Sequence, residues 1–348
     1  MQHNKERSLR DYLYLPWHAL QLASHAKSFE ANPIIGSHRL NTLGLHRQRR
    51  QMADRMAAYR RSSLAARIDT DERAAFERQG YFIRHNALPD TVFRRLRDEV
   101  RALHAQGWEM RQGLAVTRRI SLDRGVLRHN PACADFVADR SIRDLIGYAS
   151  SNTGGITYQL QSILADAPTE DSDPQTRLHS DTFHSTAKAW MFLNDVNDDE
   201  GPFSYVPGSH TLTPARLEWE YHQSLNAACS PERMHREGSF RINEDELPAL
   251  GLPAPVRFAV PANTLVVADT SGFHARCPSR RPSLRVEIYA SLRRNPFLPW
   301  RGAHLFALPL IAQNHMAWDL RLKRAMGFDK RTHWKAFDRV NAYDPASI

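Results

Sequence analysis

Between residues 154 and 293 the sequence is a succession of short segments rich in β-branched and aromatic residues, separated by turns that contain Pro and Gly. Segments of this kind that follow one another without intervening helices favour two packed sheets over an alternating α/β fold. We expect strands at 156–164, 187–193, 201–210, 263–269 and 284–290. The sequence therefore predicts a jelly roll in this part of the chain.

Helical patterns flank the β-rich region on both sides. Before it, apolar residues recur at helical spacing after capping residues, as in amphipathic helices. The elements expected there are helices at 45–67, 70–79, 88–103 and, as a pair, within 131–149, with one short strand at Tyr81–Ile83. After it, we expect helices around 312–326 and 332–340, and a further helix at 214–226 inside an insertion at 211–250.

These patterns together indicate a mostly β core with helices, an α+β arrangement. We expect a basic N-terminal helical arm at 1–69, a β domain at 70–295 and a basic C-terminal helical extension at 296–348. The length of 348 residues is sufficient for one large core with appended helices.

A His-x-Asp pair, His179 and Asp181, lies inside the β-rich region. Residues i and i+2 of a strand point to the same face, so the imidazole and the carboxylate can reach one point. The pair could also arise by chance, because the chain contains 17 His. His274, beyond a later strand, is the candidate third ligand. Two His and one carboxylate leave coordination positions open and form the ligand set of non-haem Fe(II) oxygenases, unlike a closed four-ligand zinc site.

Further polar residues could bind a cosubstrate beside such a metal. Arg285 follows His274 by 11 residues within an otherwise apolar strand. A buried guanidinium there could pair with a dicarboxylate such as 2-oxoglutarate, whereas on an exposed face it would be a surface charge. Arg276 could assist with the same carboxylates or with the substrate, and Gln159 could hydrogen-bond the cosubstrate. His184 is expected either to contact the site or to pack without a chemical role.

Four motifs in order resemble a known family. They are FERQGYFIRHNAL at 76–88, LHSDTFH at 178–184, GPFSYVPGSH at 201–210 and ADTSGFHARCPSRRPSLRVEIYAS at 268–291. Over about residues 70–295 the chain is similar to the phytanoyl-CoA dioxygenase-like Fe(II)/2-oxoglutarate-dependent oxygenases.

The resemblance implies a double-stranded β-helix, iron bound by His179, Asp181 and His274, and 2-oxoglutarate bound by Arg285. It also implies that O₂ is consumed, that an unactivated C–H bond is hydroxylated, and that CO₂ and succinate are released. Related halogenases carry a small residue in place of the carboxylate ligand, so Asp181 favours hydroxylation. The basic arms lie outside the resemblance, and a coenzyme A thioester is therefore not implied as the substrate.

The net charge of +9 is concentrated near the chain ends. Residues 1–69 contain twelve Lys and Arg against five Asp and Glu, and residues 294–348 contain nine against four. Such regions attract anionic partners or simply aid solubility. No base-reading motif accompanies the charge, so we do not expect nucleic acid. We expect an anionic or lipid-linked small-molecule substrate and peripheral contact with an anionic membrane.

Cysteine spacing and hydropathy indicate the cellular compartment that we expect for the protein. The three cysteines show no C-x-x-C spacing, which favours a reducing compartment over a disulfide framework. No apolar run long enough to span a bilayer and no secretory signal occurs, so we expect a cytoplasmic protein.

The main hypothesis is therefore an Fe(II)/2-oxoglutarate-dependent dioxygenase. One alternative is a non-catalytic basic binding module on the same scaffold, suggested by the charge of residues 1–69. The other is a metal-dependent cupin-type enzyme that does not use 2-oxoglutarate, for which loss of Arg285 would be harmless.

Overall fold

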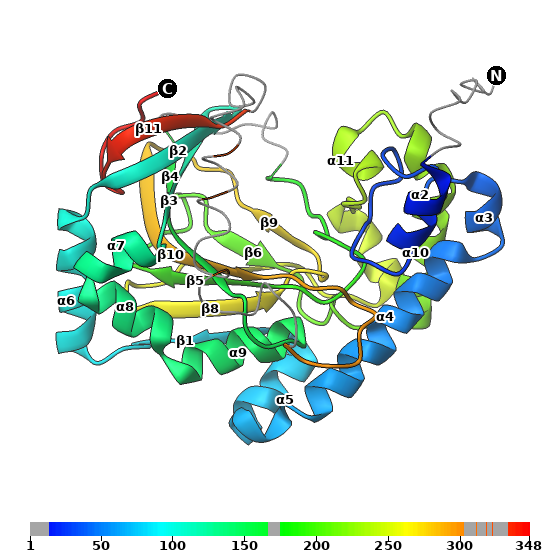
Figure 1. The fold of residues 1–348 in the computed structure, drawn as a ribbon, viewed down its shortest axis with the longest axis horizontal. Coiled ribbons are helices and arrows are strands. Elements are labelled where there is room, and N and C mark those ends of the chain that lie inside the picture. The colour runs from blue at the N-terminus through cyan, green and yellow to red at the C-terminus, as the bar shows by residue number, and fades with distance from the viewer. Residues whose placement is uncertain (1–13, 166–174, 303–310, 312–317, 319–321, 323–332) are drawn as a thin grey trace.

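Two antiparallel β-sheets face each other in this chain (Figure 1). The computed structural model describes residues 14–165, 175–302 and 333–348, together with Ile311, Trp318 and Leu322. The larger sheet has eight strands in the order β1-β8-β5-β10-β4-β3-β2-β11, and the smaller has three in the order β7-β6-β9.

The central segments alternate between the two sheets along the chain, except that β6 and β7 both belong to the smaller sheet. The larger sheet takes β4 (Thr157–Ala165), β5 (Ala187–Phe192), β8 (Thr264–Asp269) and β10 (Ser283–Leu292). The smaller sheet takes β6 (Phe203–Tyr205), β7 (Val256–Arg257) and β9 (His274–Arg276), and an isolated bridge joins His179 to its β9 edge. This alternation is that of a double-stranded β-helix, so the predicted fold class is confirmed.

Each face of the larger sheet buries a different apolar cluster. Between the sheets, aromatic residues pack together, among them Trp190, Phe192, Phe203 and Tyr289. The opposite face packs against helices α6 (Asp90–Ala102), α8 (Pro131–Ala138) and α9 (Arg140–Ser150). Because strand residues alternate between faces, this two-sided burial explains why β5 and β8 are almost continuously apolar.

Three strands extend the larger sheet from the N-terminal half. The strand expected at Tyr81–Ile83 is confirmed as β1 (Tyr81–Arg84), which pairs with β8. The hairpin of β2 (Ala105–Gln112) and β3 (Ala115–Ser121) was not predicted. Polar and charged residues interrupt both strands, so neither has the continuous β-former composition of the central strands.

The C-terminal prediction is wrong where the structure describes it. Residues 332–340 were expected to be helical, but β11 (Lys335–Val340) pairs antiparallel with β2. A Cβ at Gly107 would lie 2.5 Å from Cγ2 of Val340, so glycine in β2 permits this strand to dock. Pairing with the open edge of β2 thus overrides local helix propensity. The helix expected at 312–326 falls outside the described residues except for Trp318 and Leu322.

The helices expected before β4 are present as α4 (Leu45–Ser62) with η1 (Ala65–Arg67), α5 (Thr70–Gln79), α6, α8 and α9. The short helix α7 (Arg124–His129) was not predicted. The Asp69 carboxylate accepts hydrogen bonds from the first backbone amides of α5, and Gly80 ends that helix with a positive φ of 87°. No helix in the described part of the chain has the length and hydrophobicity needed to cross a bilayer.

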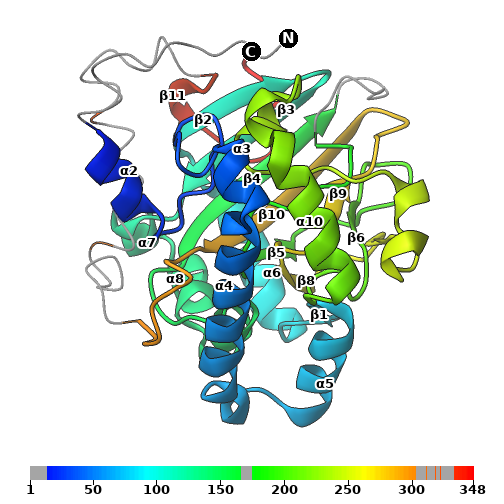
Figure 2. The ribbon, with the colours of Figure 1, turned by 90° about the vertical axis from the view of Figure 1, so that its right-hand side faces the viewer.

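The N-terminal arm packs against the insertion. The arm contributes α2 (Leu15–Gln21), α3 (His38–Thr42) and α4. The insertion contributes α10 (Pro214–Asn226), as predicted, and then η2 (Ala227–Cys229), α11 (Arg233–Arg236), η3 (Glu244–Glu246) and η4 (Pro248–Leu250). Figure 2 shows α4 running beside α10, and the two helices are in contact.

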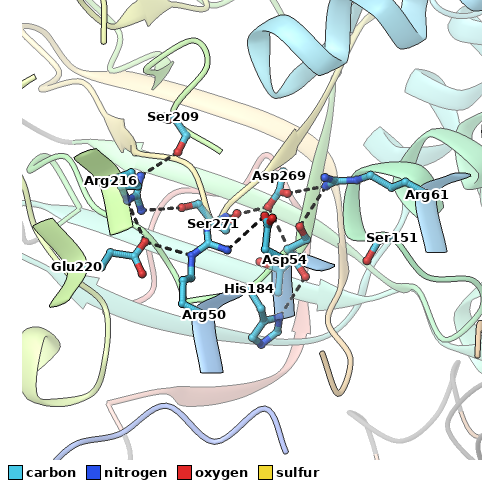
Figure 3. Close-up of polar contacts among 12 residues, drawn as sticks. Arg50, Asp54, Arg61, Ser151, His184, Ser209, Arg216, Glu220, Asp269 and Ser271 are labelled. Carbon is cyan, nitrogen blue, oxygen red and sulfur yellow. Dashed lines mark hydrogen bonds and ion pairs between the residues drawn. The ribbon is translucent and has the colours of Figure 1, made fainter. Parts of the chain in front are cut away.

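Several arginines of α4 point into the fold rather than to solvent. Arg50 is 2% exposed, and its Nε lies 3.3 Å from Oε1 of Glu220, which also pairs with Arg216 at 2.9 Å (Figure 3). Arg61 forms a 2.7 Å ion pair with Asp269, at the end of β8. These cations are therefore part of the folded core, and they are not available as a nucleic-acid surface.

Candidate metal centre

Three potential ligands converge at one edge of the smaller sheet: His179, Asp181 and His274. Their ligand atoms all lie within 4.8 Å of one another. Nε2 of His179 is 3.9 Å from Oδ1 of Asp181, and Nε2 of His274 is 3.7 Å from Oδ2. The two imidazoles are buried, while Asp181 keeps partial access to a cavity. The predicted association of these three residues is thus present in the structure.

The backbone brings the two histidines together directly. The amide of His179 donates to the carbonyl of His274 at 3.0 Å, and the amide of His274 donates back at 2.9 Å. Only His179 is in an extended bridge here, so the longer strand assumed for the His-x-Asp pair is absent. Instead, the amide of Asp181 donates to the carbonyl of Thr270 at 2.9 Å, which fixes the carboxylate beside both rings.

Hydrogen bonds select the histidine tautomer that a metal requires. Nδ1 of His179 lies 2.8 Å from the carbonyl of Arg177, and Nδ1 of His274 lies 3.0 Å from that of Gly272. A carbonyl oxygen only accepts, so each Nδ1 carries the hydrogen and each Nε2 presents a lone pair to the centre. Nε2 of His274 is buried without a hydrogen-bond partner among the described residues, as expected of an atom that binds a metal.

Electrostatics favour the same protonation states. Burial lowers the pKa of His274 to about 4 and that of His179 well below its usual value, so both rings are neutral at pH 7. Burial opposes ionisation of Asp181, but neighbouring cations, Lys188 first, hold its pKa well below the usual range. Two neutral imidazoles and one carboxylate fit a divalent metal ion.

Lys188 is a cation at this centre that the sequence did not single out. Its Nζ lies 2.6 Å from Oδ2 of Asp181. Although burial opposes the charge, Asp181 raises the pKa of Lys188 above its usual value. Lys27 of the N-terminal arm donates to the backbone carbonyl of Asp181 at 2.6 Å. The arm therefore reaches the metal centre, although it lies far away in sequence.

A cavity of about 240 Å³ opens beside the three ligands, and Arg285 lines it. Arg285 is buried rather than a surface charge. Its guanidinium donates to the carbonyl of Gly201 at 2.7 Å, and its Nε lies 3.0 Å from Oε2 of Glu287. Glu287 is fully buried, and burial raises its pKa. Gln161 donates to its other oxygen at 2.6 Å.

The remaining predicted site residues divide into two groups. Arg276, on β9, lines the cavity. Gln159 is not among the lining residues, whereas Gln161, two positions along β4, is. His184 is buried and packs edge-on against Phe183 at 5.0 Å, and it does not line the cavity. Of the two roles considered for His184, the structure therefore favours packing.

The turn after β8 positions two of the three candidate ligands, Asp181 and His274. Asp269 is fully buried and accepts hydrogen bonds from the amides of Thr186 and Ser271, besides its ion pair with Arg61 (Figure 3). This turn carries Thr270, which holds Asp181, and leads directly into His274. The sequence gives no local signal for this support, because Arg61 and Asp269 are about two hundred residues apart.

Comparison with known proteins gives one family match. Residues 76–245 match the family model described as Phytanoyl-CoA dioxygenase (PhyH). No curated protein sequence matches the chain. Among solved structures, the epimerase SnoN from nogalamycin biosynthesis, in complex with Fe3+, alpha ketoglutarate and nogalamycin RO, is 17% identical, with a TM-score of 0.44, covering 66% of this chain and 83% of its own.

Two further solved structures are similar at the same level. HygX from Streptomyces hygroscopicus, with nickel and 2-oxoglutarate bound, is 13% identical, with a TM-score of 0.41, covering 64% of this chain and 86% of its own. The carbocyclase SnoK from nogalamycin biosynthesis is 17% identical, with a TM-score of 0.42, covering 64% and 83%.

Proposed function

Because residues 76–245 match the family model of the phytanoyl-CoA dioxygenases, we propose that this chain is an Fe(II)- and 2-oxoglutarate-dependent oxygenase. The observation that carries the proposal is a single cavity faced by three metal-ligand side chains and a buried arginine, Arg285. A closed structural zinc site would have no such space beside it.

The ligand set suits a redox-active metal with open positions. His179, Asp181 and His274 would hold Fe(II), which supplies the chemistry that activates O₂. Two imidazoles and one carboxylate occupy half of an octahedron, so 2-oxoglutarate and O₂ could bind together. Retention of the carboxylate ligand supports hydroxylation, because the related halogenases have a small residue in its place.

Arg285 would bind the carboxylate of 2-oxoglutarate that lies away from the metal. The carbonyl of Gly201 and the carboxylate of Glu287 fix its guanidinium, which limits the freedom lost when a dicarboxylate binds. Trp190 and Phe203 line the same cavity with ring centroids 4.2 Å apart, and their rings exclude water from one wall. Arg276 is placed to assist at the cosubstrate or at the substrate.

The proposed reaction hydroxylates an unactivated C–H bond. Substrate R–H, O₂ and 2-oxoglutarate give R–OH, succinate and CO₂, with one oxygen atom entering each of the first two products. The substrate is a small molecule, anionic or lipid-linked. The cytoplasmic location and the peripheral membrane contact stay predictions.

Succinate release tests the function. Purified protein with Fe(II) and 2-oxoglutarate is screened against pools of acyl, lipid and small polar metabolites, and succinate and CO₂ are measured. His179→Ala and Asp181→Ala should abolish substrate-dependent succinate, while His222→Ala, an exposed histidine on α10, should leave it unchanged. Undiminished succinate in the first two variants would refute the assignment.

The same assay separates the alternatives. Arg285→Gln should raise the KM for 2-oxoglutarate sharply, whereas a cupin-type enzyme that does not use 2-oxoglutarate would be indifferent to it. A non-catalytic binding module would bind no Fe(II) together with 2-oxoglutarate. That alternative relied on the charge of the N-terminal arm, and burial of Arg50 and Arg60 removes part of its support.

A further inference from the structure

The loop between α2 and α3 brings an ammonium group to the candidate metal centre. Nζ of Lys27, a half-buried residue of this loop, donates to the backbone carbonyl of Asp181 at 2.6 Å. The two residues are 154 positions apart, and the family match begins at residue 76. This contact with a candidate ligand therefore comes from a part of the chain that the match does not cover.

Backbone hydrogen bonds from several elements hold the ligand segment 179–181. Its first residue is paired with β9, and the amide of Asp181 bonds to the turn after β8. The amide of Ser180 donates to the carbonyl of Phe240, in the insertion, at 3.0 Å. The carbonyl of Asp181 accepts from Lys27, so both peptide groups of this residue are fixed. A carboxylate on a fixed main chain loses less freedom when it binds a metal ion.

A buried arginine of α4, Arg49, organises the loop that carries Lys27. Its guanidinium donates to the carbonyls of Leu22, Ser24 and Ala26 at 3.1, 3.2 and 2.7 Å. The rigid fork of one side chain thus fixes the loop backbone immediately before Lys27. The lysine is therefore presented from an ordered loop, unlike a lysine that moves freely on the surface.

Close packing fixes the loop at Lys27 and just after it. A Cβ at Gly238, which has a positive φ of 78°, would lie 2.2 Å from the backbone oxygen of Lys27. A Cβ at Gly36 would lie 2.0 Å from the backbone oxygen of Phe29. The amide of Phe29 also donates to the carbonyl of Arg236 at 2.9 Å. Glycine at both positions therefore permits the backbone to approach the loop closely.

We propose that Lys27 is a positioning residue of the metal centre, which holds the main chain of Asp181 so that its carboxylate stays beside the two histidines. The N-terminal arm is then a part of the centre rather than a separate basic module. The inference rests on the proposed function, because it takes His179, Asp181 and His274 to bind a metal ion.

Charge and hydrogen bonding predict opposite effects of Lys27 on metal affinity. An ammonium group repels a divalent cation, so its removal would tighten metal binding if charge alone mattered. Loss of the hydrogen bond would instead free the main chain of Asp181, and loss of a partner that orients a ligand weakens metal binding by about 10–100-fold. The sign of the change therefore identifies the role of Lys27.

The test is a titration of the full-length apoprotein with Co(II), measured by the visible absorption of the bound ion and by competition with a chelator. Lys27→Met removes the donor, so it should raise the Co(II) dissociation constant about tenfold or more and alter the spectrum, which depends on ligand geometry. Lys27→Arg keeps a donor and should restore most of the affinity. The matched control is Lys335→Met, an exposed lysine of β11, which should change neither quantity.

Urea unfolding of the apoproteins separates positioning from a general effect on the fold. A lysine with only a structural role would lower the stability of the apoprotein but leave the Co(II) affinity and spectrum of the folded protein unchanged, which would overturn the inference. Equal or tighter Co(II) binding by folded Lys27→Met would also overturn it.

A shorter, neutral side chain keeps the test decisive if Lys27→Met does not fold. Positioning requires Lys27→Gln to bind Co(II) more weakly than Lys27→Arg, because the shorter amide reaches the carbonyl of Asp181 less well. Charge alone requires the opposite order, and that order or equal affinities would overturn the inference. Failure of the wild-type protein to bind Co(II) would instead refute the proposed function.

Discussion

The buried ion pair between Arg61 and Asp269 offers a quantitative test of how the metal centre is supported. Asp269 is fully buried, its oxygens accept from Arg61 at 2.7 Å and from two backbone amides, and its turn leads into His274. Asp269→Asn keeps the shape but removes the charge and places an NH₂ group where an acceptor is needed. Removal of one partner from a buried pair costs about 3 kcal/mol or more.

The assay is urea unfolding of Asp269→Asn beside Asp135→Asn. Asp135 pairs with Arg95 at 2.6 Å, but both side chains are more than half exposed, so its loss should cost less than about 1 kcal/mol. The double variant Arg61→Met/Asp269→Asn should be less destabilised than the sum of the single variants, because each single change already breaks the same pair. Equal effects of Asp269→Asn and Asp135→Asn would refute the reasoning.

The pH dependence of this pair has a definite sign. Burial opposes the charge of Asp269, but Arg61 holds its pKa below the usual value. The pair therefore contributes stability above the unfolded pKa of about 3.9 and loses that contribution as the pH falls through the lower folded value. The stability difference between wild type and Asp269→Asn should accordingly shrink in acid.

Three other predictions follow from single contacts. Glu287→Gln should raise the KM for 2-oxoglutarate several-fold with little change in Fe(II) affinity, because Glu287 fixes Arg285 and Gln161 but pairs with none of the three candidate metal ligands; unchanged steady-state kinetics would contradict this. Gly107→Ala should destabilise the fold by roughly 1–3 kcal/mol through overpacking against Val340, and Gly107→Ala/Val340→Ala should recover part of the loss in urea unfolding. His210 is buried with its pKa lowered to about 4 by burial, so it disfavours the folded state as the pH falls from 6.5 towards 4; His210→Gln should flatten stability over that window.

The central fold could be predicted because its signals are local. Strands β5 and β8 are short, largely apolar runs bounded by turn residues, and the two-sided burial of the larger sheet produces that composition. The short strands β7 and β9 lack such a signal and were not predicted. The convergence of the three candidate ligands could be predicted because His179 and Asp181 are two residues apart and His274 begins the strand that pairs with His179. Two of the three candidate ligands are therefore close in sequence, and one backbone bridge brings the third, His274, beside them.

What was missed depends on contacts between distant segments. β11 forms because β2 has an open edge and Gly107 leaves space beside Val340, and no feature of residues 332–340 alone reveals this. Lys188 and Arg119 each appear as single charges in strands. Their position in the cavity depends on which strands flank β10, and strand order is a property of the whole sheet.

Net charge was the least reliable guide to the surface of the protein, because it counts buried and exposed cations alike. Of the twelve cationic residues in the N-terminal arm, Arg49, Arg50 and Arg60 are buried and Arg61 pairs with buried Asp269. Arg49 and Arg60 donate to backbone carbonyls, and Arg50 pairs with Glu220, so their charge is used inside the fold. The external field of the arm is therefore weaker than its composition suggests. The cations of the cavity, by contrast, exceed the carboxylates beside them. An anionic ligand is therefore expected in the cavity next to the candidate metal centre rather than on the surface of the arm.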